Sequence, residues 1–294
     1  MRKLSLLLDV IWSTAFGAKA QLLYKVTAPG MESRPSYVFG THHIAPASMI
    51  DSVVGLRDAL YACDVVYGEV SSDEFTDPMR QQEYAAMLTA PADSTLTWLL
   101  TPEQQDSLSV VLSKYFGPMV ELKHVDMLKP SALMAQIQIM QSVVAFPGFD
   151  PQKLIDGELQ SIVKAAGKPN RGLESVQWQM QLLYGAPMLK QAAELMKYVA
   201  KDSESVEYMR RLAGAYCEQD LGAIESMMSD PELGMNAEEM ERLCYGRNDK
   251  WAELLVGMIP TGSIMVCVGA GHLFGDRGLL SLFRKAGFDV KPVK

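Results

Sequence analysis

The sequence Tyr37–His43 (YVFGTHH) has a related sequence, Met265–His272 (MVCVGAGH), near the other end of the chain. Each begins as an apolar run that predicts a buried strand. Each then continues as Gly-x-x-His where the strand ends. Glycine lets the backbone turn sharply there, so the histidine is presented at the carboxyl end of the strand, where sites in open α/β sheets usually form.

The two Gly-x-x-His loops can face each other only if their strands share one sheet or lie in two packed sheets. Further strands are predicted at Leu22–Val26, Asp64–Val70 and Phe288–Val293, and a helix at Ile50–Tyr61. The segment Asp77–Met258 has mainly helical spacing instead. We therefore expect an α/β (α+β) fold, in which N- and C-terminal strand-Gly-x-x-His units form a pseudo-symmetric central β-sheet core around a large helical middle insertion.

Three helices of the insertion are predicted from particular signals. Thr101 precedes Pro102 and Gln104, which is the order of an N-terminal capping box. Pro130–Ala145 is apolar on most faces, which predicts a central buried helix. A longer helix is expected over Ala237–Ile259.

Composition limits the function. The chain has 294 residues, a formal net charge of −8 and a pI of about 5.1. These values argue against nucleic acid as the main partner, because phosphate binding needs a basic surface. The length allows one large domain or two small ones. The paired loops favour one, because neither half of the chain alone would hold a complete site.

The first twenty residues have the order of a secretory signal peptide. Arg2 and Lys3 precede the mostly apolar Leu4–Trp12, and small residues then lead to an Ala-x-Ala sequence that ends at Ala20. We expect cleavage after Ala20, a periplasmic or secreted protein, and a single domain over residues 21–294. An ordinary N-terminal amphipathic helix is the alternative. No other stretch is long and apolar enough for a membrane span.

The four cysteines give no metal or redox motif. None stands in a C-x-x-C sequence, which excludes the zinc-ribbon and thioredoxin interpretations. A disulfide between Cys217 and Cys244 would be compatible with an oxidising compartment. Their spacing leaves this pairing open.

Two carboxylates stand in positions like those of the histidines. Glu69 and Glu174 each come at the end of a predicted strand, and a carboxylate buried there is costly unless it is paired or bound to metal. Two imidazoles with one or two carboxylates can bind a divalent metal and leave a position for water, with a spare carboxylate as general base. The competing interpretation is that His43 and His272 are structural.

Other chemistry is less well supported. There is no Gly-x-Ser-x-Gly sequence and no P-loop, and a dinucleotide fingerprint after Gly269 fails because Phe274 stands at its last glycine. His124 lies in a polar stretch without partners. The simplest interpretation of Asp156 is a solvated charge on a helix. The simplest interpretation of Arg247 and Asn248 is a helix cap with a salt bridge.

The chain resembles the TraB/GumN family through motifs that occur in order from about residue 22 to residue 293. They are the strand-GTxH opening at Phe39–His43, the strand ending in Glu at Val65–Glu69, the block from Ile155 through GKP at 167–169 to GLES at 172–175 and Gln179, RN-x-x-W at 247–251, and the closing VGAGHL at 268–273. This family is similar to the Tiki proteins, which are metal-dependent proteases, and to a wider group that includes erythromycin-esterase-like and ChaN-like haem-binding proteins. The resemblance implies a site made of His43, Glu69 and His272, which would bind a divalent metal. It names Mn²⁺ or Co²⁺, with Zn²⁺ as a third option. It also implies supporting roles for the nearby side chains His42, Asp156, Glu174, Arg247 and Asn248.

The leading hypothesis is an exported metal-dependent hydrolase, a Tiki-like metallopeptidase that attacks a peptide or small-molecule substrate with a metal-activated water. Here His43 and His272 bind the metal, and Glu69 binds it or acts as base. The alternative is a non-catalytic periplasmic protein of the same fold that binds haem, iron or another ligand. A third hypothesis is a signalling protein that acts by binding a peptide. Oligomeric state is left open.

Overall fold

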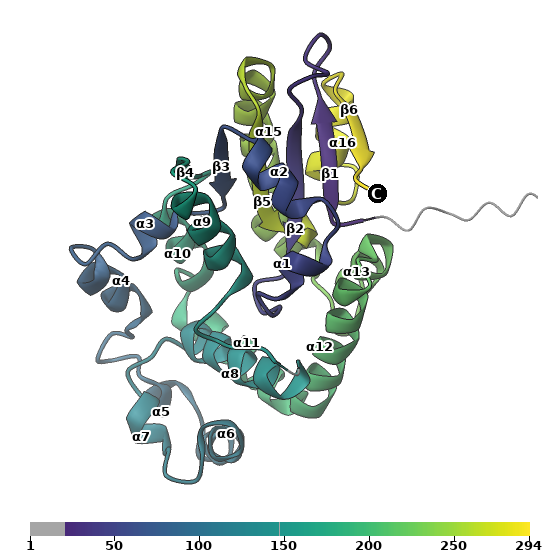
Figure 1. The fold of residues 1–294 in the computed structure, drawn as a ribbon. Helices are drawn as coiled ribbons and strands as arrows, with labels where there is room; N and C mark the ends of the chain where they lie inside the picture. The colour runs from purple at the N-terminus through teal and green to yellow at the C-terminus, as the bar shows by residue number, and fades with distance from the viewer. Residues whose placement is uncertain (1–20, 147) are drawn as a thin grey trace, which may run out of the picture.

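The computed structural model of the protein describes residues 21–146 and 148–294 (Figure 1). The signal-peptide prediction for residues 1–20 lies outside this part of the chain. In the described part, no helix is long and apolar enough to cross a membrane.

One six-stranded sheet lies at the centre of the molecule, with the strand order β4-β3-β5-β2-β1-β6. Four strands, from β4 to β2, run parallel, and β1 and β6 are antiparallel to their neighbours. The strands are β1 (Leu23–Thr27), β2 (Ser36–Thr41), β3 (Val65–Gly68), β4 (Asn170–Gly172), β5 (Ile264–Gly269) and β6 (Asp289–Pro292). The α/β prediction is therefore confirmed, and the sheet is built mainly from the two ends of the chain.

The pairing of β2 with β5 brings the two Gly-x-x-His loops together. The strands are parallel neighbours, with Phe39 opposite Cys267 and Thr41 opposite Gly269. Of the two arrangements that the sequence allowed, the shared sheet is the one found. Both loops leave the same edge of this sheet, because parallel strands end on the same side.

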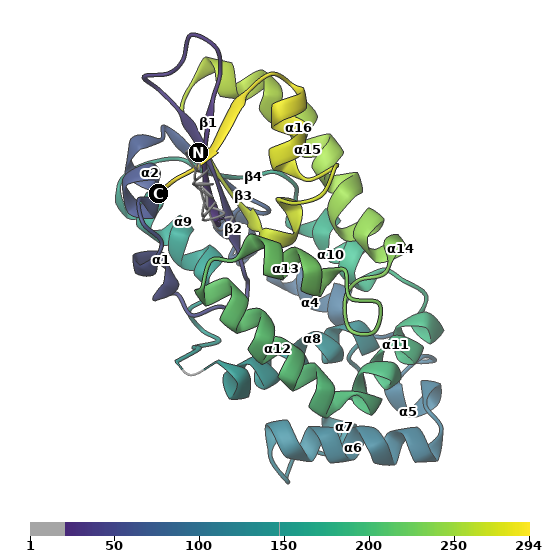
Figure 2. The same cartoon turned by 90° about the vertical axis from the view of Figure 1, so that its right-hand side faces the viewer.

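Helices cover both faces of the sheet and extend below it. In both views, α1, α2 and α9 lie on one face and α15 and α16 on the other (Figures 1 and 2). These helices are α1 (Met49–Ser52), α2 (Leu56–Ala62), α9 (Ile155–Ala165), α15 (Gly246–Met258) and α16 (Leu279–Lys285). Ile50–Tyr61 was expected as one helix, but the chain breaks at Gly55, whose φ of +75° is a conformation that glycine adopts readily.

The middle insertion is helical, as expected. Its helices are α3 (Ser72–Phe75), α4 (Gln81–Leu88), α5 (Leu96–Leu99), α6 (Pro102–Phe116), α7 (Leu122–Val125), α8 (Pro130–Ala145), α10 (Val176–Tyr184), α11 (Met188–Ala200), α12 (Asp202–Cys217), α13 (Leu221–Met228) and α14 (Ala237–Met240). The capping box at Thr101 is present, and α8 has the predicted bounds. The long helix expected from Ala237 is α14 and α15 joined by a π-helix, η1 (Glu241–Tyr245). Two short 3₁₀ helices, η2 (Ile259–Thr261) and η3 (Ala270–His272), flank β5.

The buried apolar side chains form two main clusters. The first packs around the sheet, and the second lies among α5, α6, α8 and α11. Helix α12 joins them, because Val206 belongs to the second cluster and Ala213 and Tyr216 to the first. All four cysteines are free, so the pairing left open for Cys217 and Cys244 is absent.

Candidate functional site

Three predicted site residues meet at the carboxyl edge of the sheet. His43 follows β2, Glu69 follows β3, and His272 ends the η3 turn after β5. Glu69 was expected at the end of the strand Asp64–Val70, and it directly follows the last residue of β3, Gly68. Glu69 Oε1 is 3.8 Å from His43 Nε2 and 3.5 Å from His272 Nε2. The sheet thus brings together side chains that are far apart in the sequence.

Glu69 is buried, and each of its oxygens has a different environment. Oε1 accepts a hydrogen bond from the Gly269 backbone N–H at 2.9 Å and faces both imidazoles. Oε2 accepts from Arg247 Nη2 at 2.6 Å and from Gln179 Nε2 at 2.9 Å. Burial alone would raise the pKa of Glu69, but the surrounding imidazole and guanidinium groups outweigh it and hold that pKa well below its usual value. Glu69 is therefore an anion with one oxygen fixed and the other turned to the histidines.

His43 is held from behind by Asp156. Its Nδ1 lies 2.8 Å from Asp156 Oδ2, and Thr41 Oγ1 donates to Asp156 Oδ1 at 2.7 Å. The nearby Asp156 carboxylate raises the pKa of His43 above its usual value, against the effect of desolvation. With 58% of its side chain exposed, His43 lies at the mouth of the site. The default interpretation of Asp156 as a solvated charge is wrong, because it contacts the site directly.

His272 is buried and held by an amide. Its Nδ1 is 2.7 Å from Asn248 Oδ1, while Asn248 Nδ2 donates to the backbone oxygens of His272 and Arg277. The ring packs on Trp251, with 4.6 Å between centroids. Burial lowers the pKa of His272 to about 3, so the ring is neutral. The Asn248 contact then assigns the proton to Nδ1, and Nε2 accepts from Arg247 Nη1 at 3.1 Å.

Arg247 joins the two buried carboxylates. Its Nη2 donates to Glu69 and to Glu174 Oε1, both at 2.6 Å, and its Nε donates to Glu174 Oε2 at 3.2 Å. Nη1 also donates to the Leu243 carbonyl at 2.9 Å. The predicted salt bridge is confirmed. The predicted helix cap is wrong, because η1 continues directly into α15 and buries both Arg247 and Asn248.

His42 points away from Glu69. Its ring lies against Phe146 and Tyr216, at 6.1 Å and 5.5 Å between centroids, and its buried Nε2 has no hydrogen-bond partner among the described residues. Thr41 and His43 both contact Asp156, so their side chains share the side that His42 leaves. His124 is exposed and lies far along the chain in α7, where its Nδ1 accepts from the Glu121 backbone.

Two contacts of the site were not predicted from the sequence. Thr41 holds Asp156, and Gln179 holds Glu69. Thr41 belongs to the strand-GTxH motif at residues 39–43, and that motif is a signal that could have identified it. Gln179 lies on α10, and its approach to Glu69 depends on tertiary packing.

The donor atoms were compared with what a divalent cation requires. Bonds of about 2.1 Å in tetrahedral geometry separate ligand atoms by about 3.4 Å, close to the 3.5 Å and 3.8 Å found here. A Cβ placed on Gly269 would lie 3.3 Å from Glu69 Oε1 and 3.4 Å from His43 Nε2, so glycine leaves a small space between them. Within residues 21–146 and 148–294, no three His, Cys, Asp or Glu side chains are already arranged to hold a metal ion. The oxygen and nitrogen donors nevertheless suit a divalent cation.

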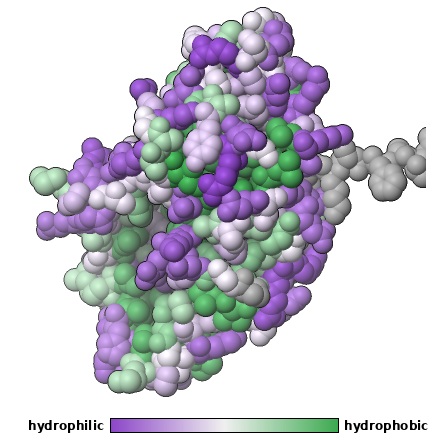
Figure 3. Space-filling model, viewed as in Figure 1, coloured by the Kyte–Doolittle hydropathy of each residue, from purple (hydrophilic) through white to green (hydrophobic). Residues whose placement is uncertain are grey.

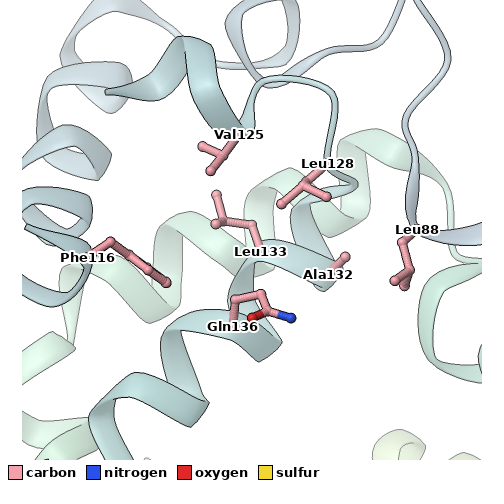
Figure 4. A pocket seen from close by; sticks show the side chains of 7 residues that line it. All are labelled: Leu88, Phe116, Val125, Leu128, Ala132, Leu133 and Gln136. Carbon is pink, nitrogen blue, oxygen red and sulfur yellow. The ribbon is translucent and has the colours of Figure 1, made fainter. Parts of the chain in front are cut away.

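A separate apolar pocket lies among the helices of the insertion (Figure 4). It has a volume of about 230 Å³ and is lined by Leu88, Phe116, Val125, Leu128, Ala132, Leu133 and Gln136. Its one polar side chain is an amide, and it contains no titratable group. It therefore offers no chemistry comparable to that of the sheet edge.

Comparison with known proteins agrees with the motifs. No curated protein and no solved structure matches the chain. The model of the TraB/PrgY/gumN family matches residues 22–292, which is nearly the whole chain and includes every residue of the site. The chain therefore belongs to the TraB/PrgY/gumN family.

Proposed function

We propose that the protein is an exported metal-dependent hydrolase, most simply a metallopeptidase, whose divalent cation is held by His43, Glu69 and His272. The observation that carries this proposal is the convergence of two imidazole Nε2 atoms on Glu69 Oε1, at 3.8 Å and 3.5 Å. Metal binding requires neutral imidazoles, and His272 is already neutral, so its Nε2 has no proton to donate to the carboxylate. Such an arrangement is favourable when a cation lies between the three atoms.

The partners behind the two histidines support the same conclusion. Asp156 and Asn248 each contact an Nδ1 atom, which leaves Nε2 as the ligand atom. A histidine that binds metal almost always donates its other ring N–H to a partner of this kind. The charges also agree: Glu69 and Glu174 contact the Arg247 guanidinium, and a third carboxylate, Asp156, contacts His43. Once both imidazoles are neutral, as metal binding requires, this leaves two negative charges for a divalent cation to balance.

A cation bound here would supply Lewis acidity, by polarising a substrate carbonyl or by lowering the pKa of a water molecule. The chain's own groups have distinct tasks. Gln179 and Arg247 fix Glu69 Oε2, so that Oε1 stays directed at the imidazoles and either binds the cation or takes up a proton. The exposed side of His43 is where substrate reaches the site.

Arg247 has a second task, which follows from the single lone pair of His272 Nε2. That lone pair accepts from Arg247 Nη1, and it cannot also bind a cation. When it is used as a ligand, Nη1 is released beside the reacting centre. There it can donate to the oxygen on which negative charge develops.

The test is metal content and peptide hydrolysis of protein purified without chelator. Wild-type protein is expected to contain bound divalent metal and to cleave peptides when Mn²⁺ or Co²⁺ is added. His43→Ala and His272→Ala should lose both properties, whereas the matched control His124→Ala should keep them. Wild-type protein without metal affinity would refute the proposal, and so would metal binding by the two variants at the wild-type level.

The haem-binding alternative is separated by an absorbance spectrum of the same sample. A Soret band would identify that alternative, because bound Mn²⁺ produces none. Export is tested independently by the N-terminal sequence of the protein recovered from cells, which is expected to begin at Gln21. Recovery of the full chain from Met1 would contradict it.

A further inference from the structure

The carboxylate that holds His43, Asp156, is itself held by Thr41. Thr41 is 1% exposed, and its hydroxyl donates to Asp156 Oδ1 at 2.7 Å. The other oxygen, Oδ2, contacts His43 Nδ1 at 2.8 Å. One carboxylate thus joins two side chains that are two residues apart in the chain.

Thr41 and Asp156 belong to different parts of the fold. Thr41 is the last residue of β2 and pairs with Gly269 of β5, so its position is fixed by the sheet. Asp156 stands in the first turn of α9, and 28% of its side chain is exposed. A partly exposed aspartate has other rotamers that point to solvent. The hydroxyl of Thr41 favours the one rotamer that reaches His43.

We propose that Thr41 is a positioning residue of this site. Its hydroxyl fixes the Asp156 carboxylate, and that carboxylate fixes the ring orientation of His43 and keeps the proton of the neutral ring on Nδ1. Nε2 is then directed at Glu69 Oε1. The consequence for metal affinity rests on the proposed function, but the effect on the ring of His43 exists in the metal-free protein.

In the second Gly-x-x-His loop, the ring of the histidine is oriented by a different kind of partner. Ala270 follows its glycine, where Thr41 follows Gly40, so no hydroxyl is available. The ring of His272 is held by Asn248, whose amide N–H₂ donates to two backbone carbonyls and so fixes its own orientation. Each imidazole therefore has a partner that is anchored in turn. Of the two partners, Asp156 is partly exposed, and it therefore needs a hydrogen bond from another side chain, Thr41, to stay in place.

Three variants test this role. Thr41→Val keeps the shape but removes the donor, and Thr41→Ser restores the donor. Thr27→Val, at a second buried threonine that ends a strand, is the matched control. The first measurement is the long-range ¹H–¹⁵N spectrum of the metal-free protein at a pH where the His43 ring is neutral, with its signals assigned by comparison with His43→Ala. Wild type, Thr41→Ser and the control should show a proton on Nδ1, and Thr41→Val should show a mixture of both tautomers.

The second measurement is Mn²⁺ affinity. Thr41→Val should lose about tenfold or more, as is typical when an outer partner of a metal ligand is removed, and Thr41→Ser should recover most of it. The proposal would be overturned if Thr41→Val kept the wild-type tautomer of His43. It would also be overturned if Thr41→Ser lost as much Mn²⁺ affinity as Thr41→Val. If Thr41→Val does not fold, Thr41→Ala, which also removes the donor, is expected to give the same tautomer mixture. Failure of wild type to bind Mn²⁺ would count against the proposed function alone, because the spectrum still tests Thr41.

Discussion

At the scale of single residues, the buried side chain of Arg247 is expected to contribute strongly to the stability of the folded protein. It is buried between Glu69 and Glu174, and the carboxylates and guanidinium neutralise one another only in part. Arg247→Ala leaves both carboxylates without a cation. Removing one partner of a buried ion pair costs roughly 3–5 kcal/mol, so we expect a loss of this size in the free energy of unfolding, measured with urea.

Arg277 provides the matched control for that measurement. It also bridges two carboxylates, Glu241 and Asp249, but at the surface, where ion pairs contribute little. Arg277→Ala should therefore lower the free energy of unfolding far less than Arg247→Ala. Equal losses in the two variants would mean that burial does not determine the importance of Arg247.

The glycines of the two Gly-x-x-His loops should respond differently to alanine. A Cβ on Gly269 enters the space between Glu69 and His43, whereas a Cβ on Gly40 would lie 2.7 Å from the side chain of Leu273. Gly269→Ala should keep its stability and lose about tenfold or more in Mn²⁺ affinity, by isothermal titration. Gly40→Ala should lose roughly 1–3 kcal/mol through overpacking. Unchanged affinity in Gly269→Ala would place the cation elsewhere.

Single residues also show the limits of sequence reasoning. His43 and His272 were identified because a repeated local pattern marks the end of a strand. Asp156 looked like an ordinary surface charge, because nothing near it in sequence reveals that α9 crosses the end of β2. The choice of His43 over His42 depends on the turn that follows β2, in which the His42 ring packs against Phe146 and Tyr216, and the sequence does not show which ring that turn directs to Glu69.

At the scale of the helices, Asp202 connects three elements through one carboxylate. It stands at the start of α12 and accepts from Lys114 and Tyr115 of α6, at 2.5 Å and 2.7 Å, and from Gln141 of α8 at 2.8 Å. Burial alone would raise the pKa of Asp202, but these hydrogen bonds lower it below its usual value. The ionised carboxylate therefore stabilises the contact between the helices.

This arrangement predicts a dependence of stability on pH. Because the pKa is lower in the folded state, the stabilisation is complete above the unfolded value of about 3.9 and is lost as the pH falls through the folded one. Asp202→Asn should lose roughly 1–3 kcal/mol at pH 7 and show a shallower fall in stability below about pH 4. Urea unfolding across pH 2–7 measures both effects. Glu204→Gln, at an exposed position in the same turn, controls for the change in charge; an equal effect there would contradict the prediction.

Elements were predicted well where local signals agree with packing. The capping box at Thr101 and the apolar length of Pro130–Ala145 gave α6 and α8 correctly. The break at Gly55 was missed, because apolar spacing continues through a glycine whose left-handed backbone separates α1 from α2. The π-helix before α15 was missed too. It places Arg247 and Asn248 on the face of the helix turned to His272, which matches the frequent occurrence of π-turns at functional sites.

At the scale of the whole molecule, the site depends on the two ends of the chain being neighbours in one sheet. The sequence indicated that the loops must meet, and it left the choice between one sheet and two open. Parallel pairing of β2 with β5 resolves that choice, and β3 adds Glu69 from the other side of β5. The order of strands could not be derived from the sequence, because it depends on contacts between residues far apart in the chain.

The two apolar clusters predict that the molecule opens in parts. Helices α5 to α7 lie at the end remote from the sheet in Figure 1, and Figure 3 shows hydrophobic surface over this lower half. Their buried side chains belong to the second cluster, which reaches the first mainly through α12. Native-state hydrogen exchange should therefore find amides of α6 opening at a lower free energy than those of β2 and β5, because separate clusters can unfold as separate units.

Two matched variants make this test decisive. Leu108 on α6 and Leu279 on α16 are both fully buried, the first in the second cluster and the second in the cluster around the sheet. Replacing a buried leucine by alanine costs roughly 2–5 kcal/mol. Leu108→Ala should speed exchange in α6 while β5 stays protected and Mn²⁺ affinity is retained. Leu279→Ala should speed exchange in both, because loss of the sheet removes the surface on which the insertion folds. If Leu108→Ala exposes β5 as much as α6, the two clusters form one cooperative unit, and the insertion cannot move independently of the site.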